Sequence, residues 1–119
     1  MTNIAFFSDI HIHPHSSSYD KLINCLDCLD WVYKESIKRG CKYIFFGGDL
    51  FHTRDRINIF AYHKTWNILK KYSDKIKSYY ILGNHDIYYK YSTVISSVEP
   101  LSALIDVISS PTTIEIDGL

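Results

Sequence analysis

The sequence has 119 residues, which is the length of a single domain at most. Thirteen acidic and thirteen basic residues give a net charge of zero, so charge neither indicates nor excludes a nucleic-acid partner. Three cysteines, an odd number, do not form a disulfide framework, and no apolar run approaches the ~18 residues of a membrane span. The short start from Met1 to Phe7 lacks the basic residues of a signal peptide. We therefore expect a cytoplasmic or otherwise intracellular protein without membrane contact.

The first half of the chain predicts a strand, a helix and a second strand. Asn3 to Ser8 is short and continuously apolar, which is typical of a strand covered on both faces. A loop from His11 to Ser18 follows, with Ser18 as a helix N-cap. Apolar residues at helical spacing then predict a helix over about 19–39, closed by Gly40, with an inward face of Leu22, Leu26, Leu29 and Tyr33. The second strand covers about 42–46.

The next stretch continues the same alternation. A second helix is predicted over about 58–72, with an inward face of Ile59, Tyr62, Trp66 and Leu69. A third strand covers about 78–82. This β-α-β-α-β order predicts an α/β fold with a parallel sheet flanked by helices and right-handed crossovers.

The last third is less regular. Residues 87–97 give no clean period, and residues 100–105 predict a short helix with proline at its first position. Residues 107–109 and 112–116 predict short strands separated at Pro111. A turn signal at Asp117-Gly118 ends the sequence, and we therefore expect residues 1–119 to be the N-terminal portion of one longer domain.

Polar side chains follow each of the three predicted strands. The first strand runs into Asp9-Ile10-His11, the second into Gly47-Gly48-Asp49, and the third into Gly83-Asn84-His85-Asp86. Because the carboxyl ends of parallel strands meet at one edge of an open α/β sheet, these side chains are expected to form one site there.

Asp9, His11, Asp49 and Asn84 form a mixed oxygen and nitrogen ligand set. Such a set suits Mn²⁺, Mg²⁺, Fe or Zn²⁺, whereas thiolates would indicate structural zinc. Asp49, in the middle motif, is placed to bridge two ions, which can clamp the attacking and leaving oxygens of a phosphoryl transfer and make a hydroxide available near neutral pH. His85 is adjacent to Asn84 and is the candidate general acid.

These three motifs together resemble those of the calcineurin-like metallophosphoesterase superfamily. The resemblance implies a β-sandwich flanked by helices, of which this chain supplies the front part, and hydrolysis of phosphoesters with two metals. It implies that Asp9 and His11 hold the first metal, that Asp49 bridges, that Asn84 holds the second metal, and that His85 assists catalysis. The family supplies three further ligand histidines downstream, and no histidine follows His85 in this sequence.

A narrower resemblance rests on Gly48-Asp49-Leu50-Phe51-His52. A histidine three residues after the bridging aspartate is similar to the break-repair nuclease branch, the SbcD-type proteins and their phage recombination-endonuclease relatives. This resemblance implies that His52 helps position a DNA end and that the reaction is exonucleolytic or endonucleolytic cleavage of DNA with Mn²⁺ by a metal-bridging hydroxide. It also implies an ABC-type coiled-coil ATPase subunit as partner, a homodimer as a further assembly, and a viral protein acting in its host cell as one source.

Other histidines and arginines leave alternatives open. Arg54 and Arg56 follow His52 closely and either contact a phosphate backbone or form a solvated bend. His13 and His15 extend Asp9-Ile10-His11 into a pattern that also resembles PHP and TatD-type metal hydrolases, although that pattern does not predict Gly-Asn-His-Asp after the third strand.

A general phosphatase or cyclic-nucleotide phosphodiesterase of the same superfamily is one rival function. A non-catalytic fragment that lacks the downstream histidines is another.

Overall fold

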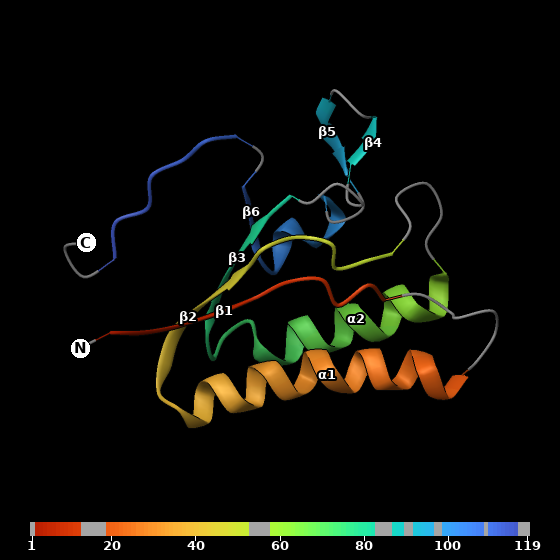
Figure 1. Cartoon of the computed structure of the whole chain (residues 1–119), viewed down its shortest axis with the longest axis horizontal. Coiled ribbons are helices and arrows are strands. Elements are labelled where there is room, and N and C mark those ends of the chain that lie inside the picture. The colour runs from red at the N-terminus through yellow and green to blue at the C-terminus, as the bar shows by residue number, and fades with distance from the viewer. Residues whose placement is uncertain are drawn as a thin grey trace.

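Figure 1 shows the chain as a computed structural model that describes residues 2–12, 19–52, 58–82, 87–89, 92–96, 99–108 and 110–116. The elements run in the order β1 (Asn3–Phe7), α1 (Tyr19–Lys38), β2 (Cys41–Phe46), α2 (Ile59–Tyr72), β3 (Lys77–Ile81), β4 (Ile87–Tyr89), β5 (Ser92–Ser96), η1 (Glu99–Ala103) and β6 (Asp106–Ile108). The predicted α/β class is confirmed. Among the helices in these ranges, none combines the length and the apolar character that crossing a bilayer requires.

The main sheet has four parallel strands in the order β1-β2-β3-β6. Phe7 of β1 pairs with Phe46 of β2, and Phe46 pairs with Tyr80 of β3, so these three strands end at the same edge. A separate antiparallel hairpin, β4–β5, projects on the side of the sheet away from α1 and α2 (Figure 1). The parallel register brings the loops after β1 and β2 together, as the strand order predicts.

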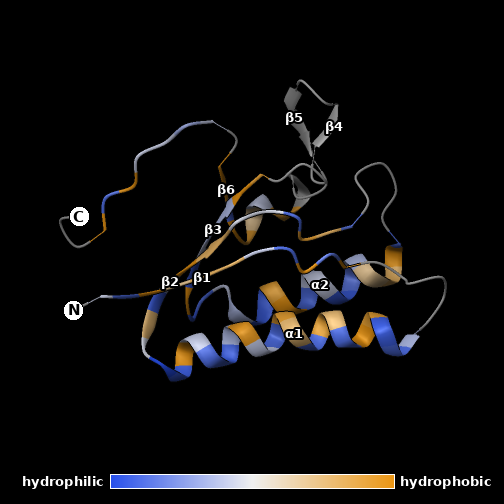
Figure 2. Cartoon of the chain, in the orientation of Figure 1, coloured by the Kyte–Doolittle hydropathy of each residue, from blue (hydrophilic) through white to orange (hydrophobic). Residues whose placement is uncertain are grey.

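Both long helices cover the same face of the sheet (Figure 1). Alternate side chains of β1 and β2 point into that layer, which is why Ile44 and Phe46 are buried. The opposite face remains open in the described residues, because Ile4 is 47% exposed and Phe6 is 68% exposed. The prediction that the first strand is covered on both faces is therefore wrong. Figure 2 shows hydrophobic colour along much of β1.

The predicted inward face of the first helix is confirmed. Leu22, Leu26, Leu29 and Tyr33 are all buried. Tyr33 stacks on Tyr72 of α2 with ring centroids 4.9 Å apart, and its hydroxyl lies 2.7 Å from the hydroxyl of Ser78 in β3. One side chain thus connects both helices to the sheet. Burial raises the pKa of the Tyr33 phenol, so this hydroxyl is neutral at physiological pH.

The inward face of the second helix differs from the prediction. The buried residues of α2 are Ala61, Thr65, Leu69 and Tyr72, while Ile59 is 85% exposed and Tyr62 and Trp66 are half-buried. The prediction is therefore confirmed for Leu69 and partly for Tyr62 and Trp66, which pack against the core, and it is wrong for Ile59. Thr65 can be buried because its hydroxyl donates to the Ala61 carbonyl at 2.8 Å, which satisfies this buried polar group.

The helix ends agree with the sequence signals. Gly40 has a φ of 74° and its N–H donates to the Ile37 carbonyl, as a C-terminal glycine does. Asn58 caps α2, because its side-chain oxygen accepts from the N–H of Ala61. The predicted N-cap Ser18 lies outside the described residues.

The irregular C-terminal third is where the prediction is weakest. Residues 87–97 contain the β4–β5 hairpin, which had no clear sequence signal. The short helix is confirmed as the 3₁₀ helix Glu99–Ala103, and the strand predicted at 107–109 is Asp106–Ile108. The strand predicted at 112–116 is wrong, since no strand in the described ranges pairs with this segment. A β-prone sequence becomes a strand only where a partner supplies hydrogen bonds.

A carboxylate joins the two helices at their outer surface. Asp30 of α1 accepts from the Tyr72 hydroxyl at 2.8 Å, and it lies 2.9 Å from the Lys34 ammonium and 3.6 Å from that of Lys71. Burial acts to raise the pKa of Asp30, but the hydrogen bonds from Lys34 and Tyr72 and the charge of Lys71 outweigh it. The pKa is therefore below its usual 3.8.

We expect Asp30→Asn to lower the free energy of unfolding by about 1 kcal/mol at pH 7. Because the pKa is lower in the folded chain than in the unfolded chain, this contribution is complete above 3.8 and disappears as the pH falls through the folded-state value. Urea unfolding at a series of pH values measures it, with Asp27→Asn on the same helix as the control. A stability difference that persists unchanged in strong acid would contradict the assignment.

Candidate metal centre

The hydrogen-bond ladder between β1 and β2 continues beyond the strands into the loops that follow them. The Gly47 N–H donates to the Phe7 carbonyl at 2.7 Å. Four further backbone hydrogen bonds of 2.8–3.1 Å join the two loops. The Asp9 N–H donates to Gly48 O, the His11 N–H to Asp49 O, the Ile12 N–H to Leu50 O, and the His52 N–H to Ile12 O. Ile12 and Phe51 form an isolated parallel bridge at the end of this ladder. The two loops are therefore held as one structural unit.

Two glycines in the second loop make this pairing possible for different reasons. A Cβ on Gly47 would lie 2.9 Å from the Cβ of Ser8 and 3.0 Å from the Phe6 ring, so there is no room for a side chain. Gly48 has a φ of 103°, a conformation that residues with a side chain rarely adopt. The pair Gly47-Gly48 allows the second loop to approach the first and then to turn Asp49 toward it.

Asp9, His11 and Asp49 come together at this edge. One potential ligand atom from each lies within 4.8 Å of the others. The same three residues are the non-glycine residues with positive φ in the described part of the chain, at 63°, 52° and 57°. Left-handed backbone costs about 1–3 kcal/mol per residue outside glycine and clusters at functional sites. The fold maintains this strain at the three residues whose side chains converge.

The donor set suits a divalent cation. Two carboxylates and one imidazole supply the oxygen and nitrogen ligands that Mn²⁺, Mg²⁺, Fe and Zn²⁺ accept. One potential ligand atom from each residue is close enough to the others to bind the same cation. The residues present therefore fit a metal, and Asp9, His11 and Asp49 are those that could hold it.

The neighbours of Asp9 stabilise its carboxylate in the ionised form. The Ser8 hydroxyl donates to one carboxylate oxygen of Asp9, and the His11 Nε2 lies 3.3 Å from the other. These hydrogen bonds, that of Ser8 first, hold the pKa of Asp9 below its usual 3.8. The carboxylate is consequently ionised at any pH at which a metal site would operate.

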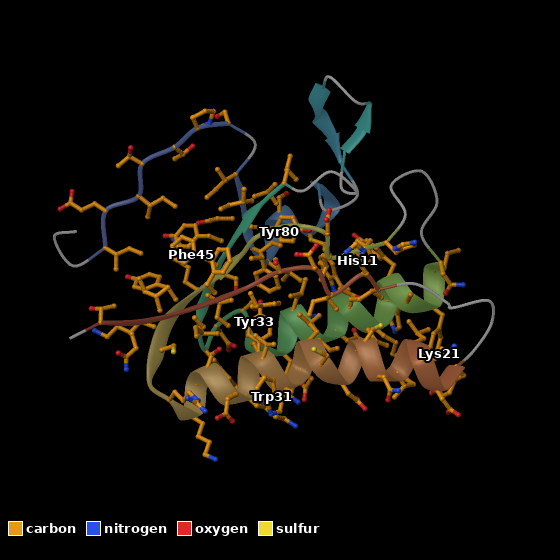
Figure 3. All side chains as sticks on the ribbon, in the orientation of Figure 1. His11, Lys21, Trp31, Tyr33, Phe45 and Tyr80 are labelled. Atoms are coloured by element: carbon orange, nitrogen blue, oxygen red, sulfur yellow. The ribbon has the colours of Figure 1, made fainter. Side chains whose placement is uncertain are left out.

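His52 lies directly beside the cluster. Its Nδ1 is 3.3 Å from the Nδ1 of His11, and the two rings meet edge to face with centroids 5.4 Å apart. Because the His11 Nε2 faces Asp9, the two nitrogens of His11 have different neighbours. Figure 3 shows His11 at the edge of the sheet where this cluster forms. His52 therefore lies beside the candidate ligands and contacts one of them, His11.

The structure thus brings together Asp9, His11, Asp49 and His52 of the predicted site residues. Asn84 and His85 lie outside the described residues, as do Arg54 and Arg56, so their predicted roles stay predictions. Cys25, Cys28 and Cys41 form no disulfide bond in the structure.

Sequence reasoning missed two contributors to the site. Ser8 holds the Asp9 carboxylate, and a hydroxyl directly before the first aspartate was a signal that could have indicated it. Tyr80 accepts a hydrogen bond from the backbone N–H of Leu50 at 2.8 Å. Nothing in the sequence distinguishes Tyr80 from Tyr79, because which tyrosine faces the helices depends on the register of the sheet.

This fold and site define an α/β protein with a metal-ligand cluster at the carboxyl edge of a parallel sheet. The sequence profile of the calcineurin-like phosphoesterase family matches residues 2–118, and the chain belongs to this family. No curated protein sequence is similar enough to be counted as a relative. The four-stranded sheet with its helices is consistent with the front part of the metallophosphoesterase fold, as predicted. Membership implies a metal-dependent phosphoesterase that uses divalent metals.

We expect Ser8→Ala to raise the pKa of Asp9 toward 3.8 in the metal-free chain, since the Ser8 hydrogen bond is the largest cause of its lowering. A ¹³C NMR titration of the side-chain carboxylates measures this directly. Glu35 serves as the internal reference, because its lowered pKa depends on Arg39 and should not change. An Asp9 titration that is the same in both proteins would show that Ser8 does not hold this carboxylate.

Proposed function

We propose that this phosphoesterase cleaves DNA phosphodiesters, as the nuclease subunit of a recombination or repair complex. The observation that carries the proposal is the position of His52, whose ring lies 3.3 Å from that of the metal-ligand candidate His11. The histidine follows Asp49 by three residues, the spacing that resembles the break-repair nucleases. A second imidazole at this point can donate a hydrogen bond to a phosphate that approaches the metals and so help to hold the phosphate in a fixed orientation.

The residues would divide the work as follows. Asp9, His11 and Asp49 would hold one divalent ion, and Asp49 and Asn84 would hold the second. Bound ions supply charge that neutralises the phosphate and polarises its oxygens. His52 orients the phosphate, and His85 gives a proton to the leaving oxygen. Arg54 and Arg56 contact the flanking backbone of the DNA, which needs only positive charge and no sequence code.

The cofactor of this proposal is a pair of divalent ions, with Mn²⁺ preferred over Mg²⁺, Fe and Zn²⁺. Its partners are DNA and an ABC-type coiled-coil ATPase subunit, with a homodimer as the further assembly, and the reaction takes place inside a cell. These partners follow from the resemblance of Gly48-Asp49-Leu50-Phe51-His52 to the break-repair nucleases.

The direct test is cleavage of linear duplex DNA by the chain with Mn²⁺. We expect Asp49→Asn to reduce the rate by about 100-fold or more, beyond the usual effect of residues that only support a ligand. Asp30→Asn, which removes a carboxylate on the outer helical surface, should leave the rate unchanged. Removal of the metal with a chelator should abolish cleavage, and Mn²⁺ should restore it.

His52→Ala separates the nuclease proposal from its rivals. The expected result is a large loss of DNA cleavage with Mn²⁺ affinity nearly retained, since His52 is beside the ligands and is not one of them. Efficient cleavage of a small chromogenic phosphoester with DNA untouched would instead indicate a general phosphatase or cyclic-nucleotide phosphodiesterase. Metal binding with no hydrolysis of either substrate would indicate a non-catalytic half-site.

A further inference from the structure

Asp49 needs support on both sides of its strained backbone. It has a φ of 57° and follows Gly48 at 103°, so two consecutive residues are in the left-handed region. On one side, the carbonyls of Gly48 and Asp49 accept from the N–H groups of Asp9 and His11 in the first loop. The next peptide N–H, that of Leu50, does not donate to the first loop. It donates to the side-chain oxygen of Tyr80, at 2.8 Å.

Tyr80 belongs to β3, which lies on the opposite side of β2 from β1, and its side chain contacts the Leu50 peptide from there. The β2–β3 ladder ends where Phe46 pairs with Tyr80, four residues before Leu50, so no backbone group of this ladder meets the Leu50 N–H. The phenol spans that gap. Tyr80 has no exposed surface, and its ring packs against Phe46 with centroids 5.7 Å apart. Figure 3 labels Tyr80 on the sheet.

We propose that Tyr80 is a positioning residue for the metal centre. Its hydroxyl oxygen fixes the peptide that joins Asp49 to Leu50, and this peptide sets the direction of the Asp49 carboxylate toward Asp9 and His11. Leu50 is itself buried, with 1% of its surface exposed, so its N–H has no access to water that could replace the phenol. Removing the oxygen would therefore let the peptide rotate to find another acceptor. Tyr80 acts through Asp49 and touches no reacting atom.

The inference rests on the metal site of the proposed function and not on DNA as substrate. Its test compares Tyr80→Phe with Tyr33→Phe in the full chain. The two substitutions are matched, because each removes one hydrogen-bonded hydroxyl from a tyrosine that is at most 1% exposed. The Tyr33 hydroxyl contacts Ser78 within the core and has no link to the ligand loops.

The first readout is Mn²⁺ affinity by calorimetry, at a temperature where both variants are folded. Tyr80→Phe should weaken binding about tenfold, the lower end of the effect of residues that support a metal ligand. Tyr33→Phe should change it by no more than about twofold, as expected for a distant and independent site. An equal loss in both variants, or no loss in Tyr80→Phe, would overturn the proposal.

The second readout does not depend on the metal. In the metal-free chain, the amide of Leu50 should exchange with solvent faster in Tyr80→Phe than in Tyr33→Phe, measured by NMR after correction for global stability. If the wild-type chain takes up no Mn²⁺, the proposed metal function fails, and the role of Tyr80 is decided by this amide alone. Unchanged exchange at Leu50 would then refute it.

Discussion

The site depends on the parallel hydrogen-bond ladder between β1 and β2 and, above all, on its continuation past the ends of the strands. Ordinary strand pairing stops at Phe7 and Phe46, yet backbone hydrogen bonds continue to His52. These hydrogen bonds hold together two polar loops that carry the Asp9 and Asp49 carboxylates. The ladder fixes both loops by their backbones and leaves their side chains available for ligand binding.

The helices and the core support the two ligand-bearing loops through the sheet. The helices α1 and α2 lie on one face of the sheet and pack against Phe46 of β2 and Tyr80 of β3. This packing helps to fix the register of β2 against β3. That register is what brings the phenol of Tyr80 to the Leu50 peptide. The core therefore stabilises the fold and also holds the peptide that follows the candidate ligand Asp49. In our proposal, stability and metal affinity are coupled through the Tyr80 hydroxyl, whereas the Tyr33 hydroxyl, which lies beside that of Ser78, contributes to stability alone.

Much of the fold could be predicted because its signals are local. Helical spacing of Leu22, Leu26, Leu29 and Tyr33 identified the buried face of α1, and Gly40 marked its end. The errors occurred where tertiary contacts outweigh the local pattern. Ile59 is exposed although it is apolar, because the buried residues of α2 are Ala61, Thr65, Leu69 and Tyr72. The segment 112–116 has strand-forming residues but no neighbouring strand in the described chain.

The sequence by itself determined the class of site, since aspartate and histidine after successive strands of a parallel sheet must meet at one edge. It also identified Asp9, His11, Asp49 and His52, because side-chain chemistry and spacing are properties of the sequence. Only the tertiary structure decided how they are held: the left-handed backbone of the three ligand candidates, the tight approach of Gly47 to Ser8, and the hydrogen bond from Leu50 to Tyr80. The physical reason is that backbone strain and buried hydrogen bonds arise between segments distant in the chain, and only packing brings those segments together.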